Sequence, residues 1–376
     1  SKQHLTSDSK SDDIVQIVKD IIGLHATSPT TPYLSLFART RNFAKEQLDE
    51  ELYIKRNLGK IRCMRKTLYA LSKEMMHIAY SATKEMVEPL SEKYSQHLGV
   101  TKEVYEETSK LILKILKGKG MTAKDVKNAL KTELNISAIV NLMCDQGLLI
   151  RGKSRNGWKS NIHTYYLFDD YFPDIDLNAV DEVKARKFLV KQYLASFGPV
   201  TENDIVWWTG FLKGEVRKIL ESLRDQITQI EISSMKGLYL MLSSDLKSLQ
   251  SVKSRKYCVN LLPSLDPYLM GYKDRERYLN SKNYDYVLDR SGNATSAILL
   301  NGEVVGVWDI AEEPEPKIKL FLFEEVEERV LNDIYIMAEK IGKFIADSNV
   351  QIKECDSMVP LTRRTAGAVM SPLKGC

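Results

Sequence analysis

Residues 136–168 read ISAIVNLMCDQGLLIRGKSRNGWKSNIHTYYLF, and this stretch carries the clearest structural signal of the chain. Apolar residues at helical spacing run up to Gly147, which predicts that a helix ends there. Two extended segments follow, residues 148–153 and 162–168, with Asn156-Gly157 between them. Because Asn-Gly between extended segments is a strong hairpin signal, the stretch predicts a helix followed by a two-stranded wing.

The same order of elements extends in both directions along the chain. Two predicted helices, residues 101–116 and 122–130, precede the stretch, and each begins at a threonine that can cap it. A second copy follows, with helices at residues 181–197, 201–209 and 213–223 and strands at residues 227–233 and 238–243. Three helices and a hairpin in this order are typical of a winged helix, so the pattern predicts tandem winged-helix units.

The remaining segments complete the expected architecture. Residues 12–96 are mostly helical in pattern, with one partly strand-like segment at residues 60–71. After residue 254 the chain changes to shorter alternating segments, which predict a β-rich region closed by a helix at residues 324–346. We therefore expect an α+β fold with three tandem winged-helix units followed by a small C-terminal β-barrel-like domain. The expected boundaries are residues 11–98, 99–178, 179–250 and 255–376.

Composition excludes several classes of protein. The chain has 376 residues, 43% hydrophobic and 28% charged, which is typical of a soluble chain with more than one folding unit. No apolar run is long enough to span a membrane, and the first 13 residues are too polar for a signal peptide. The five cysteines are scattered, without metal-ligand spacing, so we expect reduced thiols, a cytoplasmic location and no metal. The net charge of +4 permits a polyanionic partner.

The hairpin of residues 148–168 is strongly basic. No acidic residue lies between Arg151 and Tyr165, and His163 lies at the end of this segment. The side chains that could contact DNA there are Lys153, Arg155, Trp158 and Lys159. Cations that neutralise phosphates beside an aromatic ring indicate nucleic-acid binding. The alternative is a solvated hairpin anchored by one tryptophan.

A second basic stretch lies in the first predicted unit. Residues 39–66 contain nine lysines and arginines against four acidic residues. The candidates for DNA contact are Arg39, Arg62, Arg65 and Lys66. Alternation along a strand would divide these side chains between two faces, so a plain surface strand is an equal alternative.

Four ordered motifs resemble the AlkZ/YcaQ family of winged-helix DNA glycosylases. They are GLHATSP with YLSLFAR at residues 23–39, MRKTL at 64–68, FGPVT with WWTG at 197–210, and LLPSLDPY with GYKDR at 261–275. The resemblance implies three winged helices and a C-terminal β domain around duplex DNA. It also implies excision of bulky N7-alkylated purines without a metal or cofactor.

The resemblance assigns catalysis to a Gln-x-Gln or Gln-x-Asp motif, and the aligned residues in this chain are His25 and Thr27. A neutral imidazole can accept a proton from water, and the Thr27 hydroxyl can share that water. On an extended segment the two side chains would lie on one face. We expect the imidazole to open into a cationic hollow. The alternatives are that His25 only caps free carbonyls at a helix end, or lies on the surface without a role.

The last motif, at residues 261–275, has two interpretations. Asp266 precedes a proline and can build a turn rather than act as an acid. Lys273 and Arg275 are candidates for DNA contact, or members of an internal ion-pair network. The adjacent Trp207 and Trp208 are interpreted as core aromatics rather than a base cage.

These observations favour a monofunctional glycosylase-like repair protein that acts on alkylpurines in double-stranded DNA, with His25 and Thr27 positioning the water. We expect a cytoplasmic, nucleoid-associated monomer that needs no cofactor and has no membrane partner. The alternatives are a non-catalytic DNA-binding protein that has lost the catalytic pair, and a winged-helix module that binds proteins. Phosphate-binding loops and Ser/His/Asp arrangements were not found, which argues against NTPase and classical hydrolase functions.

Overall fold

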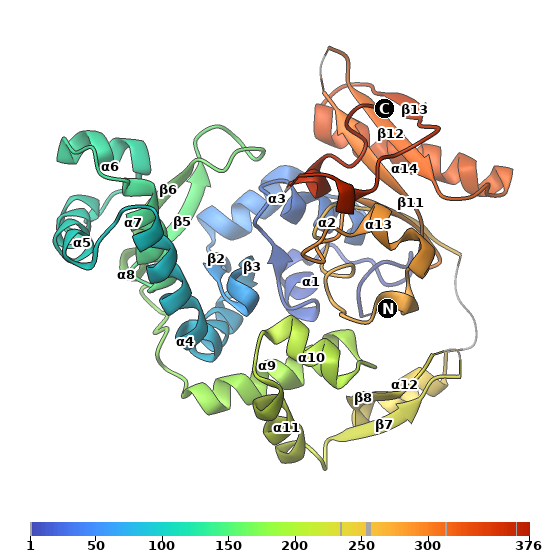
Figure 1. The fold of residues 1–376 in the computed structure, drawn as a ribbon, viewed down its shortest axis with the longest axis horizontal. Coiled ribbons are helices and arrows are strands. Elements are labelled where there is room, and N and C mark those ends of the chain that lie inside the picture. The colour runs from blue at the N-terminus through green and yellow to red at the C-terminus, as the bar shows by residue number, and fades with distance from the viewer. Residues whose placement is uncertain (1, 234, 253–256, 313, 366) are drawn as a thin grey trace.

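The computed structural model describes residues 2–233, 235–252, 257–312, 314–365 and 367–376. The fold is mixed α+β. The N-terminal elements, blue in Figure 1, lie at the centre, and the later segments are arranged around them. Among the described residues, no helix combines the length and the apolar character that a membrane crossing requires.

The N-terminal segment is built around a small three-stranded sheet with the order β1-β3-β2. Its elements are α1 (Ile14–Asp20), β1 (Leu24–His25), α2 (Thr31–Arg39), α3 (Lys45–Asp49), β2 (Leu58–Arg62), the helical turn η2 (Met64–Lys66), β3 (Leu68–Ser72) and α4 (Lys73–His97). Asp13 caps α1, because its carboxylate accepts a hydrogen bond from the Gln16 amide at 2.9 Å. Gly23 then turns the chain into β1 with φ +97°, and a Cβ there would lie 2.4 Å from Leu71 Cδ2, so no larger residue fits.

The next two segments each contain three helices and a hairpin followed by a short fourth helix, and the first also has the short strand β4. The first has α5 (Lys102–Leu116), β4 (Met121–Thr122), α6 (Ala123–Leu130), α7 (Ile136–Asp145), β5 (Leu149–Ser154), β6 (His163–Leu167) and α8 (Phe168–Tyr171). The second has α9 (Glu182–Phe197), α10 (Glu202–Thr209), α11 (Lys213–Ser222), β7 (Ile227–Glu231), β8 (Leu238–Leu242) and α12 (Leu246–Gln250). Thr122 and Thr201 occupy equivalent positions, since each forms a capping box with the aspartate three residues later.

The C-terminal segment is an open sheet rather than a barrel. Its strands are β9 (Val259–Leu262), β10 (Ala297–Leu300), β11 (Glu303–Ala311), β12 (Lys317–Leu322) and β13 (Gln351–Glu354), with α13 (Tyr284–Val287) and α14 (Glu328–Ala346). The strand order is β13-β12-β11-β10-β9, and among the described residues β9 and β13 do not pair with each other. The expected barrel-like closure is therefore wrong, and α14 covers the sheet instead, contacting β9, β12 and β13.

Residues 261–277 join the sheet to the other segments. Arg39 of α2 is fully buried and donates two hydrogen bonds to Asp266, at 2.8 and 2.7 Å. Asp266 also accepts from the Tyr268 amide at 2.9 Å, which is the turn that an aspartate before proline favours. The ion pair and the turn make this motif a structural joint between α2 and the sheet.

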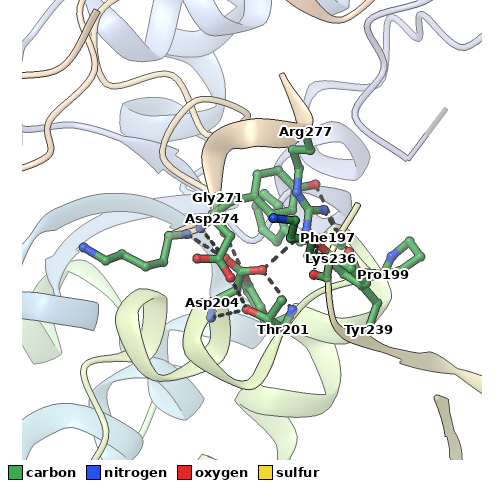
Figure 2. A network of polar contacts seen from close by, with 12 residues as sticks. Phe197, Pro199, Thr201, Asp204, Lys236, Tyr239, Gly271, Asp274 and Arg277 are labelled. Carbon is green, nitrogen blue, oxygen red and sulfur yellow. Dashed lines mark hydrogen bonds and ion pairs between the residues drawn. The ribbon is translucent and has the colours of Figure 1, made fainter. Parts of the chain in front are cut away.

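A second polar network, drawn in Figure 2, joins the same motif to α10. Asp204 has no exposed surface and accepts hydrogen bonds from the amides of Lys273 at 2.7 Å and Asp274 at 2.9 Å. Arg277 donates to the Pro199 carbonyl at 2.8 Å, and Thr201 donates to Asp274 at 2.8 Å. The Asp204 carboxylate thus has partners from the other segment, which is the condition for burying it at modest cost.

Two cysteines lie together, contrary to the expectation that all thiols are free. Cys355, just after β13, forms a disulfide with Cys376, whose Cα lies 5.9 Å away. Cys63 and Cys144 are buried and free. The disulfide holds the last residues against the edge of the C-terminal sheet.

Candidate nucleic-acid interface

A cleft of about 660 Å³, lined by both polar and apolar side chains, lies between the N-terminal sheet, the end of α4, α7 and the β5–β6 hairpin. We call it the α4–α7 cleft. Four residues expected to act on DNA line it, namely Thr27, Arg62, Lys66 and His163. The cleft therefore collects part of the predicted site in one place, from segments far apart in the sequence.

Positive charge exceeds negative charge in the α4–α7 cleft. Asp145, 3% exposed, accepts from Arg62 at 2.8 Å and from Ser91 at 2.7 Å, and Arg151 lies 3.7 Å away. Lys66 adds a third cation, whose ammonium donates to the Leu90 carbonyl at 2.9 Å. One carboxylate against three cations leaves a surplus of positive charge that suits a phosphate-containing ligand.

Three polar atoms in residues that line this cleft have no hydrogen-bond partner among the described residues. They are Ser95 Oγ, Arg151 Nη1 and His163 Nδ1. Ser95 is 3% exposed and Arg151 is 4% exposed. These atoms are themselves buried, so they lie beneath the surface of the cleft, and Arg151 bonds to Asn141 through its other terminal nitrogen at 2.7 Å.

His163 is neutral in this environment. Burial, with smaller effects from the nearby cations Lys60 and Arg151, lowers its pKa to about 3. A neutral imidazole offers one donor and one acceptor, whereas an imidazolium would add another positive charge. A neutral His163 can still donate its one N–H to a phosphate oxygen, so the predicted phosphate contact stays a prediction.

His25 and Thr27 do not share one open surface. His25 is 4% exposed, pairs in β1 opposite Tyr69, and its ring centroid lies 5.2 Å from that of Tyr69. Thr27, two residues later, is exposed and lines the α4–α7 cleft, while His25 does not. The expectation that the imidazole opens into a hollow is wrong, because His25 faces the packed side of the small sheet.

The electrostatics of His25 follow from this burial. Its pKa is lowered to about 3, first by burial and then by the charge of Arg65. Its Nδ1 is buried and has no partner among the described residues. At neutral pH the ring is uncharged and weakly basic, so it can accept a hydrogen bond but is a poor general base.

The basic hairpin loop is neutralised within the molecule. Lys153 pairs with Asp49 at 2.8 Å, Arg155 pairs with Asp125 at 2.9 Å, and Lys159 contacts Glu312. These three cations remain 61%, 55% and 34% exposed, and they are tied to α3, α6 and the end of β11. The loop therefore bridges segments of the protein in this structure.

Trp158 anchors the same loop between two segments. Its ring lies 5.2 Å from that of Tyr33 in α2 and 5.8 Å from that of Phe344 in α14. Lys45 lies 4.9 Å from the Trp158 ring and 5.1 Å from the Phe344 ring. Trp158 is therefore an anchor, as one interpretation of the sequence expected. It packs between α2 and α14, so the hairpin loop is held against other segments and is not simply solvated.

The remaining predicted contacts lie away from the cleft. Arg39 is buried in its ion pair with Asp266, so its guanidinium is not available to DNA, and its role is structural. Arg275 is 5% exposed and donates to the Gly292 carbonyl at 2.6 Å, which also gives it a structural role. Arg65 stacks on Trp207 at 3.8 Å, between η2 and α10, and Lys273 is exposed.

Sequence reasoning missed the residues of α4 and α7 that line the cleft. They include Tyr94, Ser95, Ser137, Asn141 and Asp145, together with Asn135, which caps α7. The helical spacing of Asn141 and Asp145, four residues apart, places both on one face of α7 and was the available signal. Nothing local indicated that α4 would face them. Among the described residues, no group of three His, Cys, Asp or Glu side chains could hold a metal ion.

The fold and the motifs define a class of DNA-repair protein. The family model described as "DNA glycosylase AlkZ-like" matches residues 18–330, so the chain belongs to the AlkZ-like family. The fold is similar to that of Streptomyces sahachiroi DNA glycosylase AlkZ, with a TM-score of 0.73 and 18% sequence identity. That match covers 94% of this chain and 96% of the other. No curated protein matched this sequence.

Proposed function

We propose that this protein binds duplex DNA and hydrolyses the N-glycosidic bond of N7-alkylated purines, leaving an abasic site. The observation that carries the proposal is that Thr27, which the resemblance to the family aligns with a catalytic motif position, lines a cleft with surplus positive charge. We infer that the helix-and-hairpin segments at residues 11–98, 99–178 and 179–250 are winged-helix units, followed by the C-terminal β domain. We also propose that the protein acts as a monomer, is associated with the nucleoid and needs no cofactor.

The chemistry asks little of the protein because an N7-alkylpurine already carries a positive charge and leaves without protonation. What the site must supply is a positioned water and stabilisation of an oxocarbenium-like sugar. The Thr27 hydroxyl can hold the water from the cleft wall. His25, which belongs to β1, is neutral and has an unpaired Nδ1, so it can orient the backbone that carries Thr27 but supplies no negative charge.

The test is a duplex that carries a single N7-methylguanine. Incubation with the protein followed by heat or alkali should break the strand at the lesion, and Thr27→Ala should abolish the breaks. His25→Ala should reduce them at least tenfold if the imidazole orients the motif. His97→Ala, an exposed residue at the end of α4, is the matched control and should cleave like the wild type.

A second function is favoured by one observation, the burial of His25 with a pKa of about 3. A DNA-binding protein that has lost the catalytic pair would retain the cleft and bind the lesion without excising it. Binding without strand breaks, at protein in large excess over DNA, would support this function and contradict catalysis.

A further inference from the structure

A concentration of positive charge lies outside the α4–α7 cleft, on α5, α6 and the turn between them. Residues 110–131 contain seven lysines and one acidic residue. Their net charge of +6 exceeds the net charge of +4 of the whole chain, so the remainder of the chain is slightly negative. None of these residues lines the cleft. The charge of this surface is therefore separate from that of the cleft.

Most of these lysines are not neutralised within the molecule. Lys127 pairs with Glu133 at 2.8 Å, while the acidic residue Asp125 pairs with Arg155 at 2.9 Å. Asp170, in the neighbouring helix α8, accepts a hydrogen bond from a backbone amide at 3.0 Å. The other six lysine side chains are exposed and have no hydrogen bond or ion pair among the described residues. We call these six the lysine face, namely Lys110, Lys114, Lys117, Lys119, Lys124 and Lys131.

The lysine face and the cleft lie on opposite sides of α7. One side of α7, including Asn141 and Asp145, lines the cleft. Its other side packs in a shared core with Ile112 of α5 and Val126 of α6. Lys114 follows Ile112 by two residues, and two residues turn a helix by about 200°, so this lysine points away from the core. Figure 1 shows α5 and α6 at the outer edge of the molecule, so a ligand in the cleft leaves the lysine face free.

The spacing and the residue type of the lysine face suit a row of phosphates. Lys110, Lys114 and Lys117 form one stripe along α5, which is about 10 Å long at 1.5 Å per residue. Each strand of DNA carries one phosphate per roughly 3.4 Å along the helix axis. Lys119 extends the stripe into an open turn, because a Cβ at Gly118 would have no atom within 4 Å. Lysine binds phosphate as a point charge without the planar fork of arginine, so the surface suits the backbone rather than the bases.

We propose that the lysine face binds the phosphate backbone of a second segment of duplex DNA, without sequence preference, while the α4–α7 cleft contacts the first. The inference goes beyond the proposed excision, because the second segment needs no lesion, and it rests on the proposed function for the first segment. A protein held on one segment meets a neighbouring segment at a high effective concentration. The lysine face would therefore promote transfer between segments.

Sedimentation velocity with an excess of a short undamaged duplex, at low salt, counts the duplexes that each protein binds. The 42.9 kDa protein should carry two duplexes, and the second should dissociate when salt is added. The combined variant Lys110→Gln, Lys114→Gln, Lys117→Gln and Lys119→Gln should lose at least about tenfold in affinity for the second duplex. It should cleave a duplex with one N7-methylguanine like the wild type. Arginine at the same four positions keeps the charge and should restore the second duplex.

Four other lysines give a control with the same change in net charge. They are exposed and have no side-chain ion pair among the described residues, namely Lys184, Lys191, Lys218 and Lys353. Glutamine at these four positions should leave both duplexes bound. Loss of the second duplex in this control as well would overturn the inference, because it would attribute the effect to net charge rather than to the lysine face.

The remaining outcomes separate this inference from the proposed function. One duplex per protein, in the wild type and in the lysine-face variant alike, would overturn the inference and leave the proposed function intact. Binding of a polyglutamate peptide that depends on the lysine face, without a second duplex, would also overturn it and would assign the face to an acidic protein partner. Absence of any bound duplex would contradict both.

Discussion

At the scale of single residues, His25 shows how packing limits what a predicted catalytic side chain can do. The backbone of β1 holds it opposite Tyr69, and Arg65 adds positive charge nearby. The sequence indicated the motif position from its neighbours, but burial depends on the packing of β3 and η2 around it. Such packing is set by long-range contacts that no local pattern contains.

The buried imidazole predicts a specific pH dependence of stability. The pKa of His25 is about 3 in the folded protein, against 6.5 for a free side chain. Between these values the unfolded chain binds a proton that the folded protein does not, so stability falls as the pH decreases below about 6.5. The loss is at most about 1.4 kcal/mol per pH unit for one such group. His163 contributes in the same direction, because burial lowers its pKa as well.

Melting temperatures measured between pH 7.5 and 4.5 test this prediction. His25→Gln removes the titrating group and should make the decrease in melting temperature below pH 6.5 shallower than in the wild type, while the curves above that pH run parallel. His97→Gln, at an exposed position, is the control. Parallel curves for His25→Gln over the whole range would contradict the burial of a neutral imidazole.

At the scale of elements, helices with local signals were predicted closely. Thr101 accepts from the Val104 amide and starts α5, and Thr201 starts α10, as their sequence patterns indicated. The β5–β6 hairpin was predicted as well. The ion pairs of its loop were not predicted, because Asp49 and Glu312 lie more than 100 residues along the chain from Lys153 and Lys159. In the first segment the predicted strand at residues 60–71 is interrupted by η2, where Arg65 and Lys66 both have positive φ.

The loop between β5 and β6 should depend on Trp158 for its position. Trp158→Ala removes the ring contacts to Tyr33 and Phe344, which should destabilise the protein by about 1–3 kcal/mol, less than for a fully buried tryptophan. Trypsin should then cleave faster after Arg155 and Lys159. Ile162→Ala, in the same loop at a 51% exposed position, should leave cleavage unchanged. Equal cleavage rates in the two variants would show that the tryptophan does not hold the loop.

At the scale of the whole molecule, residues 261–277 connect α2, α10 and the C-terminal sheet. Arg39 with Asp266, and Asp204 with the amides of Lys273 and Asp274, form the two buried joints. The motif was recognisable in the sequence, and a structural role was one of its two interpretations. The open sheet could not be predicted in the same way, because closure depends on whether β9 and β13 pair across the intervening chain.

The arrangement of charges over the molecule predicts which lysines determine the salt dependence of DNA binding. Phosphate contacts release counterions, so the logarithm of the affinity falls with the logarithm of salt concentration, by roughly one unit of slope per contact. Lys66 lies in the α4–α7 cleft and its ammonium donates to a carbonyl, whereas Lys153 is paired with Asp49. Lys66→Gln should therefore lower the slope for duplex DNA by about 1, and Lys153→Gln should leave it unchanged. Anisotropy titrations between 50 and 200 mM salt measure both slopes, with duplex length held constant. A lower slope only for Lys153→Gln would contradict this prediction. It would mean that lysines of the β5–β6 loop exchange their carboxylate partners for phosphates, and that DNA contacts this loop rather than the α4–α7 cleft.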